Sequence, residues 1–312
     1  MNMIEVNNLT KDYGMGRGIF NVSFEVKEGE VFGFLGPNGA GKTTTIRHLM
    51  GFIKAQEGSL KIKGQDCWKS SSIIKNDVGY LPGELAFPEN MTGNSFIKFM
   101  ASERNITDMS YAYELQNIFE FEGTEMIKEM SLGNKRKLAV VTAFMHNPKI
   151  LILDEPTSGL DPVMQDRFIN FILSEKEKGK TILLSSHIFT EVDATCDRIA
   201  IIKDGEIVST IESTKLKRST NKAFKIEFSS ELDYEMFLDK TEFVIPIKKE
   251  KQNQIKINLT DQKMQDLFKE LSQVNINFIS EIKFTLEDYF MDFYDRDKSI
   301  NEGKESMQNE LY

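Results

Sequence analysis

The sequence has little of what marks a secreted or a membrane-spanning protein. It holds two cysteines, Cys67 and Cys196, whose contexts match no metal-binding or redox spacing, so we expect buried thiols in a reducing compartment. No uncharged apolar run reaches the roughly 18 residues that a membrane-spanning helix requires. Met1–Glu5 show neither the basic nor the apolar region of a secretory signal. Any work at a membrane is therefore expected to go through a partner protein.

Basic residues are also too few to favour a nucleic-acid partner. The chain carries 39 Lys and Arg against 48 Asp and Glu, which gives a formal net charge of −9. Non-specific binding to DNA or RNA depends on neutralising phosphates with Lys and Arg, and the sequence has no sustained basic block. The apolar share of 40% and the charged share of 28% are those of a globular protein. We predict no nucleic-acid partner and, from 312 residues, two domains.

Most of the chain alternates short β-rich runs with helical stretches, which is typical of an α/β domain. Alternating residues at Val22–Val26 and Leu60–Ile62 predict half-buried strands. Ile199–Val208 contains the dipeptide Asp204-Gly205 and predicts a β-hairpin with a tight turn. Continuous apolar runs predict strands buried on both faces, as in a parallel sheet. These runs are Val31–Leu35, Val78–Leu81, Ile150–Leu153 and Thr181–Leu184.

Two regions differ from this pattern. Between residues 89 and 144, apolar residues recur at helical spacing, which predicts a mainly helical insertion between two strands of the sheet. After residue 213 a polar, basic connection leads to short strand and helix patterns, which predict a small α+β domain. We place the α/β domain at residues 1–213, a linker at 214–222, the small domain at 223–295 and a flexible tail at 296–312.

A glycine-rich loop follows the first buried strand. Gly36–Thr44 reads GPNGAGKTT and matches G-x-x-x-x-G-K-[ST], with a strand pattern before it and a helical pattern after it. The glycines let backbone N–H groups wrap a phosphate chain, and the positive end of the following helix points at the same anion. Lys42 would reach the β- and γ-phosphates of ATP, and the Thr43 hydroxyl would hold Mg²⁺. The predicted nucleotide-binding residues of this loop are Gly36, Asn38, Gly39, Gly41, Lys42, Thr43 and Thr44.

Two adjacent carboxylates, Asp154 and Glu155, end the predicted strand that begins at Ile150. Neighbouring strand residues point in opposite directions, so we assign Asp154 to the Mg²⁺ shell and Glu155 to the attacking water. Taken alone, the pair is better explained as a solvated acidic turn. The phosphate loop favours the functional interpretation, because ligands gather at the carboxyl ends of parallel strands.

These motifs together resemble the ATP-binding cassette ATPases, the cytoplasmic motor subunits of ABC transporters. The resemblance covers roughly residues 3–213 and implies a P-loop NTPase fold of the ABC type. The matches to the family are Tyr13 for the aromatic residue that stacks on adenine, Gly36–Thr44 for Walker A, Ile150–Glu155 for Walker B, Ser158–Asp161 for the D-loop and His187 for the switch histidine.

The signature motif departs from the family pattern. Met130–Asn134 stands where the family reads L-S-G-G-Q, with Leu132 for the first glycine and Asn134 for the glutamine. Ser131 and Gly133 keep the hydroxyl and the unhindered amide that would meet the γ-phosphate at a helix N-terminus. Leu132 is therefore expected to point away from the nucleotide.

The Q-loop departs as well, because Gly83 stands where a glutamine is usual, with Glu84 next to it as a candidate substitute. Leu-Pro-Gly-Glu loops of this kind occur in a branch of bacterial exporters related to bacitracin-resistance and amphipathic-peptide transporters. Phe284–Phe290 also resembles the C-terminal region of that branch. The resemblance therefore favours export of a peptide, an antibiotic or another amphipathic compound over import.

The resemblance further implies a head-to-tail pair of ATPase subunits, identical or closely paralogous, with two ATP molecules between them. Each nucleotide would meet Lys42 and Thr43 of one chain and Ser131, Gly133 and Asp161 of the other. Hydrolysis would use Lys42, the base Glu155 and the switch residue His187. A separate transmembrane permease would dock in a groove near Gly83–Met91 and be driven by ATP hydrolysis. This contact would place the chain in the cytoplasm at the inner face of the membrane.

Two other functions stay open at this stage. One is a soluble cassette ATPase of translation or DNA repair, although such proteins usually carry two cassettes or long coiled coils. The other is a non-hydrolytic module gated by ATP, which the altered signature and Q-loop suggest. His48 and His146 have no metal-like neighbours and are interpreted as structural histidines. The C-terminal domain is expected either to join or regulate the ATPase subunits or to act as a stabilising cap.

Overall fold

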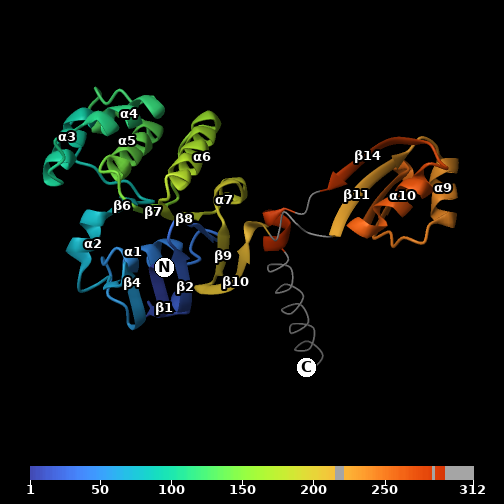
Figure 1. Ribbon diagram of the computed structural model, residues 1–312, viewed down its shortest axis with the longest axis horizontal. Helices are drawn as coiled ribbons and strands as arrows, with labels where there is room; N and C mark the ends of the chain where they lie inside the picture. Colours follow the sequence, from blue (N-terminus) through green and yellow to red (C-terminus); the bar gives the residue numbers. More distant parts are fainter. Residues whose placement is uncertain (215–220, 283–284, 292–312) are drawn as a thin grey trace, which may run out of the picture. The chain divides into compact units, whose positions relative to one another are not determined.

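The computed structural model describes residues 1–214, 221–282 and 285–291. The chain divides into two compact units, Met1–Ser213 (unit 1) and Thr214–Tyr312 (unit 2) (Figure 1). Six residues of the expected linker, 215–220, lie outside the described residues, as do Phe284 and the expected tail at 296–312. No helix within the described ranges combines the length and the apolar character that crossing a bilayer requires.

A six-stranded sheet forms the centre of unit 1. Five of its strands run parallel, and β10 pairs antiparallel with β9 at one edge. Every residue of β3, β7 and β8 is buried, as expected for a parallel sheet covered on both faces. The predicted α/β fold is confirmed. In spatial order the strands are β10 (Glu206–Glu212), β9 (Arg198–Lys203), β3 (Val31–Leu35), β8 (Thr181–Ser186), β7 (Ile150–Asp154) and β6 (Val78–Leu81).

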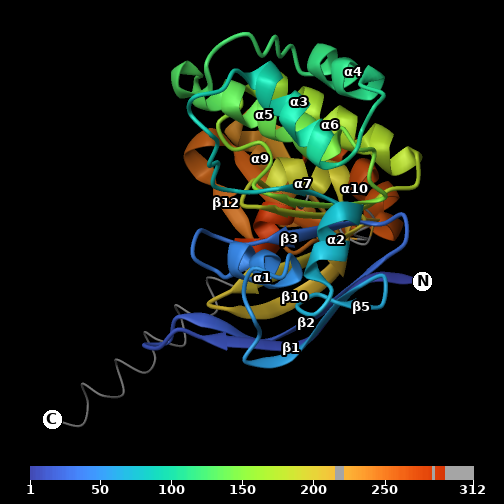
Figure 2. The same cartoon turned by 90° about the vertical axis from the view of Figure 1, so that its left-hand side faces the viewer.

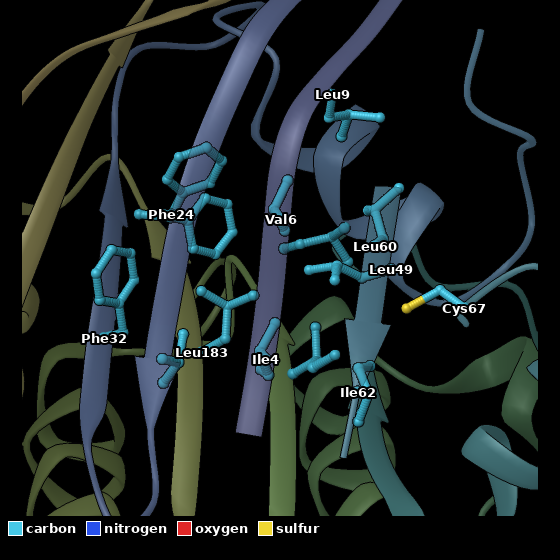
Figure 3. Packing of buried hydrophobic residues seen from close by; sticks show 14 of the residues in the cluster. Ile4, Val6, Leu9, Phe24, Phe32, Leu49, Leu60, Ile62, Cys67 and Leu183 are labelled. Atoms are coloured by element: carbon cyan, nitrogen blue, oxygen red, sulfur yellow. The ribbon is translucent and has the colours of Figure 1, made fainter. Parts of the chain in front are cut away.

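A second, antiparallel sheet packs against the first. Helix α1 (Lys42–Leu49) contacts β7 of the parallel sheet and β4 of the antiparallel sheet. Figure 3 shows the side chains between them, where Phe24 stacks on Phe32 with ring centroids 5.3 Å apart. Burial of this apolar surface holds α1, the helix that follows the phosphate loop, between the two sheets. In spatial order the strands are β2 (Gly18–Lys27), β1 (Asn2–Asp12), β4 (Glu57–Ile62) and β5 (Gln65–Asp66).

A group of helices lies on the side of the parallel sheet away from β1 and β2 in both views (Figures 1 and 2). Tyr111 of this group donates a hydrogen bond from its hydroxyl to the buried carboxylate of Glu175 at 3.2 Å, and Phe119 packs edge-on against Phe171. These contacts fasten the insertion to the body of unit 1. The helices are α3 (Gly93–Glu103), α4 (Ser110–Ile118) and α5 (Leu132–Phe144) of the insertion, followed by α6 (Pro162–Glu177). Shorter helices are α2 (Ser71–Asp77), α7 (Phe189–Thr195) and the 3-10 turn Ile127–Glu129.

The β9–β10 hairpin connects the antiparallel sheet to the phosphate loop. Asp204 and Gly205 both have positive φ, +48° and +83°, which is the conformation of a type I′ turn. The Gly205 N–H donates to the carbonyl of Ala40, and the Phe20 N–H donates to the carbonyl of Gly205. The tip of the hairpin therefore holds the phosphate loop and the start of β2 together.

Unit 2 is a βαββαβ domain. Its antiparallel sheet has the order β12-β13-β11-β14, which is the split βαβ arrangement of ferredoxin-like folds. Phe224, Ile226 and Phe228 alternate along one strand into its core, which Tyr234 and Phe237 of the first helix complete. The elements are β11 (Asn221–Phe228), α9 (Glu231–Lys240), β12 (Ile247–Lys249), β13 (Gln254–Thr260), α10 (Met264–Leu271) and β14 (Ile276–Ile282), with 3-10 turns at Glu250–Gln252 and Asp261–Lys263.

Candidate functional site

The phosphate loop is shaped by glycines and closed by Lys42. A Cβ on Gly36 would lie 2.4 Å from the carbonyl oxygen of Ile202, so no side chain fits there. Gly41 has a φ of +110°, in the region that glycine adopts without strain. The Lys42 ammonium donates to the carbonyls of Gly36 and Pro37 at 2.6 and 3.1 Å. The loop therefore curls around a buried positive charge.

The other residues predicted in this loop lie at its outer turn and in the first turn of α1. Asn38 and Gly39 are exposed, whereas Thr43 and Thr44 are half-buried. Because the first N–H groups of a helix have no intrahelical partner, this end of α1 favours an anion. The placement suits the predicted contacts with phosphate.

Lys42, Glu155 and His187 form a continuous chain of charged and titratable groups. The Lys42 ammonium pairs with Oε1 of Glu155 at 3.0 Å, and Nδ1 of His187 lies 2.7 Å from Oε2 of the same carboxylate. Glu155 has a φ of +48°, which is uncommon for a residue with a side chain. This turn takes Glu155 out of the strand direction that Asp154 follows. The structure thus brings together the three residues predicted to be catalytic.

Asp154 is fully buried at the end of β7. The hydroxyl of Ser185 donates to its Oδ1 at 2.5 Å, while its Oδ2 has no hydrogen-bond partner among the described residues. Burial, followed by the charge of Asp154, raises the pKa of Tyr80 to about 12. A buried carboxylate oxygen without a partner fits a cation ligand, and Mg²⁺ prefers oxygen donors, usually one or two carboxylates with phosphates and waters. The described residues contain no cluster of three or more His, Cys, Asp or Glu that would form a metal cage by itself.

The signature residues cap α5. Ser131 is exposed and accepts a hydrogen bond from the Asn134 N–H at 3.2 Å. The side chain of Leu132 lies against the backbone of Gly159, where an added Cβ would be 2.8 Å from Leu132 Cδ2. Gly133 also lies near this glycine, since a Cβ on Gly133 would be 3.3 Å from the carbonyl oxygen of Gly159. Leu132 thus turns toward the D-loop.

Two more predicted residues lie on loops at the rim of unit 1. Asp161 is exposed and caps α6 by accepting from the Met164 N–H at 2.9 Å. Tyr13 lies between β1 and β2, is 52% exposed, and has the Lys11 ammonium 5.5 Å from its ring centroid. The loop that carries Tyr13 leads into β2, which the hairpin tip joins to the phosphate loop.

Arg136 is a residue of this region that sequence reasoning missed. It is 2% exposed, and its guanidinium donates to the carbonyls of Pro82, Gly83 and Ser158. Burial lowers the pKa of Arg136, whereas the nearby charges of Asp154 and Glu155 oppose that shift. The sequence held one indication that Arg136 is buried. It stands three residues before Ala139, which places both residues on the buried face of a helix.

The remaining histidines and the cysteines lie in structural surroundings. Nδ1 of His48 is 2.7 Å from the carbonyl of Thr44, and burial lowers the pKa of His48. Burial also lowers the pKa of His146, to about 4. Cys67 and Cys196 are free and buried, and burial raises the pKa of each thiol to about 12. Neutral imidazoles and thiols fit the structural interpretation.

Comparisons with known proteins agree with these motifs. The family model described as ABC transporter matches residues 19–158. The chain is 34% identical over 232 residues to the bacitracin transport ATP-binding protein BcrA of Bacillus licheniformis, covering 73% of this chain and 76% of the relative. It is 34% identical over 295 residues to an ABC transporter ATP-binding protein of Methanocaldococcus jannaschii, covering 93% and 98%.

Solved structures share the fold of unit 1. The ATP-binding subunit of an ABC transporter superposes with a TM-score of 0.63 at 28% identity, covering 69% of this chain and 92% of that one. A dimeric ATP-binding cassette in a post-hydrolysis state, bound to ADP and phosphate, gives 0.62 at 25% identity, covering 68% and 99%. Fold and motifs together define a P-loop ATPase of the cassette type. The chain belongs to the ABC transporter family, as an ATP-binding, ATP-hydrolysing subunit, which confirms the resemblance stated from the sequence.

Proposed function

We propose that this ATPase works as two copies that close head to tail on two ATP molecules and drive export through a separate transmembrane subunit. The observation that carries the proposal is the chain Lys42–Glu155–His187, which assembles a phosphate-binding cation, a carboxylate base and a histidine at one place. The exposed fractions of the three side chains are 5%, 16% and 45%. The base is thus shielded from bulk water, and the histidine faces outward.

Binding of a triphosphate would change the pairing of Lys42. Its ammonium lies at the loop that would hold the β- and γ-phosphates, and a transfer of this cation to phosphate frees Oε1 of Glu155 to accept a proton from water. His187 holds the other carboxylate oxygen in place. A positioned general base contributes about 10²- to 10⁴-fold in rate.

Thr43 and Asp154 would hold the Mg²⁺ that accompanies ATP. The half-buried hydroxyl of Thr43 and the unpartnered Oδ2 of Asp154 are both oxygen donors, as this cation prefers. When bound, Mg²⁺ neutralises charge on the phosphates.

The second copy would supply the other half of each site. Ser131 and Asp161 are exposed, and Gly133, two residues after Ser131, is half-buried. This exposure suits contact with a nucleotide on a facing subunit. Shifting a two-state equilibrium from 1:99 to 99:1 takes about 5.5 kcal/mol of differential binding. Two triphosphate bridges would each supply about half of that.

The membrane subunit would dock near Gly83–Met91, with the chain held at the inner face of the membrane. Leu85 and Phe87 of this segment are half-buried rather than covered, and Phe87 packs edge-on against Phe96 of α3. Relatives named for bacitracin transport and linearmycin resistance support export of a peptide or antibiotic-like compound.

A single preparation tests this function. The affinity-tagged chain is purified from gently solubilised membranes, and phosphate release is measured with ATP and Mg²⁺. We expect a membrane-spanning protein to co-purify and the complex to release phosphate continuously. Recovery of the chain without any membrane protein would favour a soluble ATPase, and a stable complex without turnover would favour an ATP-gated module.

A further inference from the structure

Arg136 connects three segments of unit 1 that lie far apart in the sequence. Its Nη1 donates to the carbonyl of Pro82 at 2.9 Å and its Nη2 to that of Gly83 at 2.8 Å. Its Nε donates to the carbonyl of Ser158 at 2.9 Å. Arginine presents its donors in a rigid, planar fork, so one side chain fixes two different loops to α5.

The two loops held in this way flank the acidic residues of the site. A Cβ on Gly83 would lie 3.0 Å from Oδ2 of Asp154, so the backbone of the Q-loop rests against that carboxylate. Ser158 stands three residues after Glu155, and its own N–H donates to the carbonyl of Glu155 at 3.2 Å. The carbonyls that Arg136 binds therefore belong to the immediate surroundings of Asp154 and Glu155.

A second contact joins α5 to the D-loop. Leu132, at the start of α5, packs over Gly159, one residue beyond the carbonyl that Arg136 holds. Helix α5 and the D-loop therefore share one apolar contact and one partly buried hydrogen bond. Both carry residues that we propose to face the ATP of the second copy.

We infer that Arg136 is a positioning residue for ATP hydrolysis, which couples α5 to the Q-loop and the D-loop through three backbone carbonyls. The inference rests on the proposed function. Gly83 has no side chain with which the Q-loop could bind α5. The guanidinium of Arg136 makes this connection instead, from α5 to the backbone of the Q-loop. Arg136 touches no reacting atom, and it acts through the placement of Asp154, Glu155 and the signature residues.

Substitution by lysine isolates the positioning role. Arg136→Lys keeps the positive charge near Asp154 and Glu155, but a single ammonium on a flexible stem does not reproduce the fork geometry. Misplacement of catalytic groups by about 1 Å can cost 10²-fold. We expect kcat of the solubilised complex to fall by about 10- to 100-fold, with KM and the Kd of a non-hydrolysable ATP analogue within about threefold of wild type.

Arg104 offers a matched control. It also ties two segments by donating to backbone carbonyls, those of Asn76 and Lys75 at 3.1 and 3.3 Å, and burial lowers its pKa as well. Both carbonyls belong to α2, and within the described part of the chain Arg104 makes no hydrogen bond to the Q-loop, the D-loop, Asp154 or Glu155. Arg104→Lys should leave kcat within about twofold of wild type. Loss of comparable hydrogen bonds outside the Q-loop and the D-loop should not displace the catalytic residues.

Hydrogen exchange adds a readout that a purely structural role would not give. In Arg136→Lys, backbone amides of residues 83–87 and 158–161 should exchange faster, while those of β3 and β8 keep their protection. Arg136→Gln serves as a second variant that keeps donors without the charge. A kcat within twofold of wild type in both variants, an equal loss in Arg104→Lys, or unfolding of both Arg136 variants would overturn the inference. Absence of turnover in the wild-type complex would instead remove the proposed function.

Discussion

At the residue scale, Glu155 is the centre of the site because both of its carboxylate oxygens are engaged. Oε1 pairs with the Lys42 ammonium, and Oε2 lies 2.7 Å from Nδ1 of His187. A phosphate that attracts Lys42 competes with Glu155 for the same cation. We therefore expect the ion pair between Glu155 and Lys42 to weaken when a nucleotide binds.

Glu155→Gln should separate binding from hydrolysis. The amide cannot accept a proton from water, so phosphate release from the complex should fall by about 10²- to 10⁴-fold. The Kd for ATP should stay the same or decrease, because Lys42 loses a competing anion. Both are measured on the solubilised complex. Glu57→Gln, on the exposed surface of β4, is the control, and turnover near the wild-type rate in Glu155→Gln would exclude Glu155 as the base.

Glu191 predicts a pH dependence of stability. It is 2% exposed and accepts from the hydroxyl of Ser186, and burial raises its pKa from 4.5 to about 7. The folded state therefore keeps a proton that the unfolded state loses between these values, so this group lowers stability as pH rises through that window. From pH 5 to pH 8, Glu191→Gln should gain up to about 3 kcal/mol relative to wild type.

Urea denaturation of both proteins at pH 5, 6, 7 and 8 measures that difference. A constant offset between wild type and Glu191→Gln is expected from the changed hydrogen bonds and does not bear on the prediction. A difference that stays flat across the pH range would mean that Glu191 ionises normally in the folded protein.

At the scale of elements, the sequence predicted the buried strands well because they are continuous apolar runs bounded by polar turns. It did not predict β1, although Ile4, Val6 and Leu9 are all buried. The spacing of two residues changes to three after Val6, where the register shifts and Asn8 has a φ of +49°. A bulge of this kind breaks the alternation by which strands are recognised.

Contacts between residues far apart in the sequence were also not predictable. Lys42, Glu155 and His187 were predicted one by one from motifs, but their arrangement in one chain of contacts required the fold. Arg136 was missed because its partners lie 22 to 54 residues away and are backbone carbonyls, which leave no trace in residue type. The strand order of unit 2 was not predictable for the same reason.

The tip of the β9–β10 hairpin is expected to support both the fold and the phosphate loop. A Cβ on Gly205 would lie 2.5 Å from the carbonyl of Gly18, and Gly205 has a positive φ. Gly205→Ala should therefore destabilise the fold and also weaken ATP binding, because the tip also binds the carbonyl of Ala40. Gly64→Ala is the matched control, since Gly64 has a φ of +74° but nothing within 4 Å of an added Cβ.

Strain alone should cost about 1 to 2 kcal/mol in Gly64→Ala, with ATP affinity unchanged. Gly205→Ala should cost more and raise the Kd for ATP several-fold. Urea denaturation and a fluorescent nucleotide titration give the two quantities. Equal behaviour of the two variants in both measurements would show that the hairpin does not position the phosphate loop.

At the scale of the whole molecule, every predicted site residue lies in unit 1, and they differ in exposure. Lys42 and Glu155 are shielded within the chain, whereas Ser131 and Asp161 are exposed on loops and helix ends. One copy thus shields Lys42 and Glu155, which would act on its own ATP, and exposes Ser131 and Asp161, which would meet the ATP of the other copy. This division is the physical basis for expecting two copies to share each nucleotide.

Disulfide cross-linking in the assembled complex tests this claim most directly. Asn38→Cys places a thiol on the exposed outer turn of the phosphate loop, and Leu132→Cys places one at the 59% exposed signature position. The native thiols of Cys67 and Cys196 are buried and should not compete. In the Glu155→Gln background with ATP and Mg²⁺, mild oxidation should yield a covalent dimer of the chain, and with ADP it should not. ATP bound to the complex without any ATP-dependent cross-link would contradict the account.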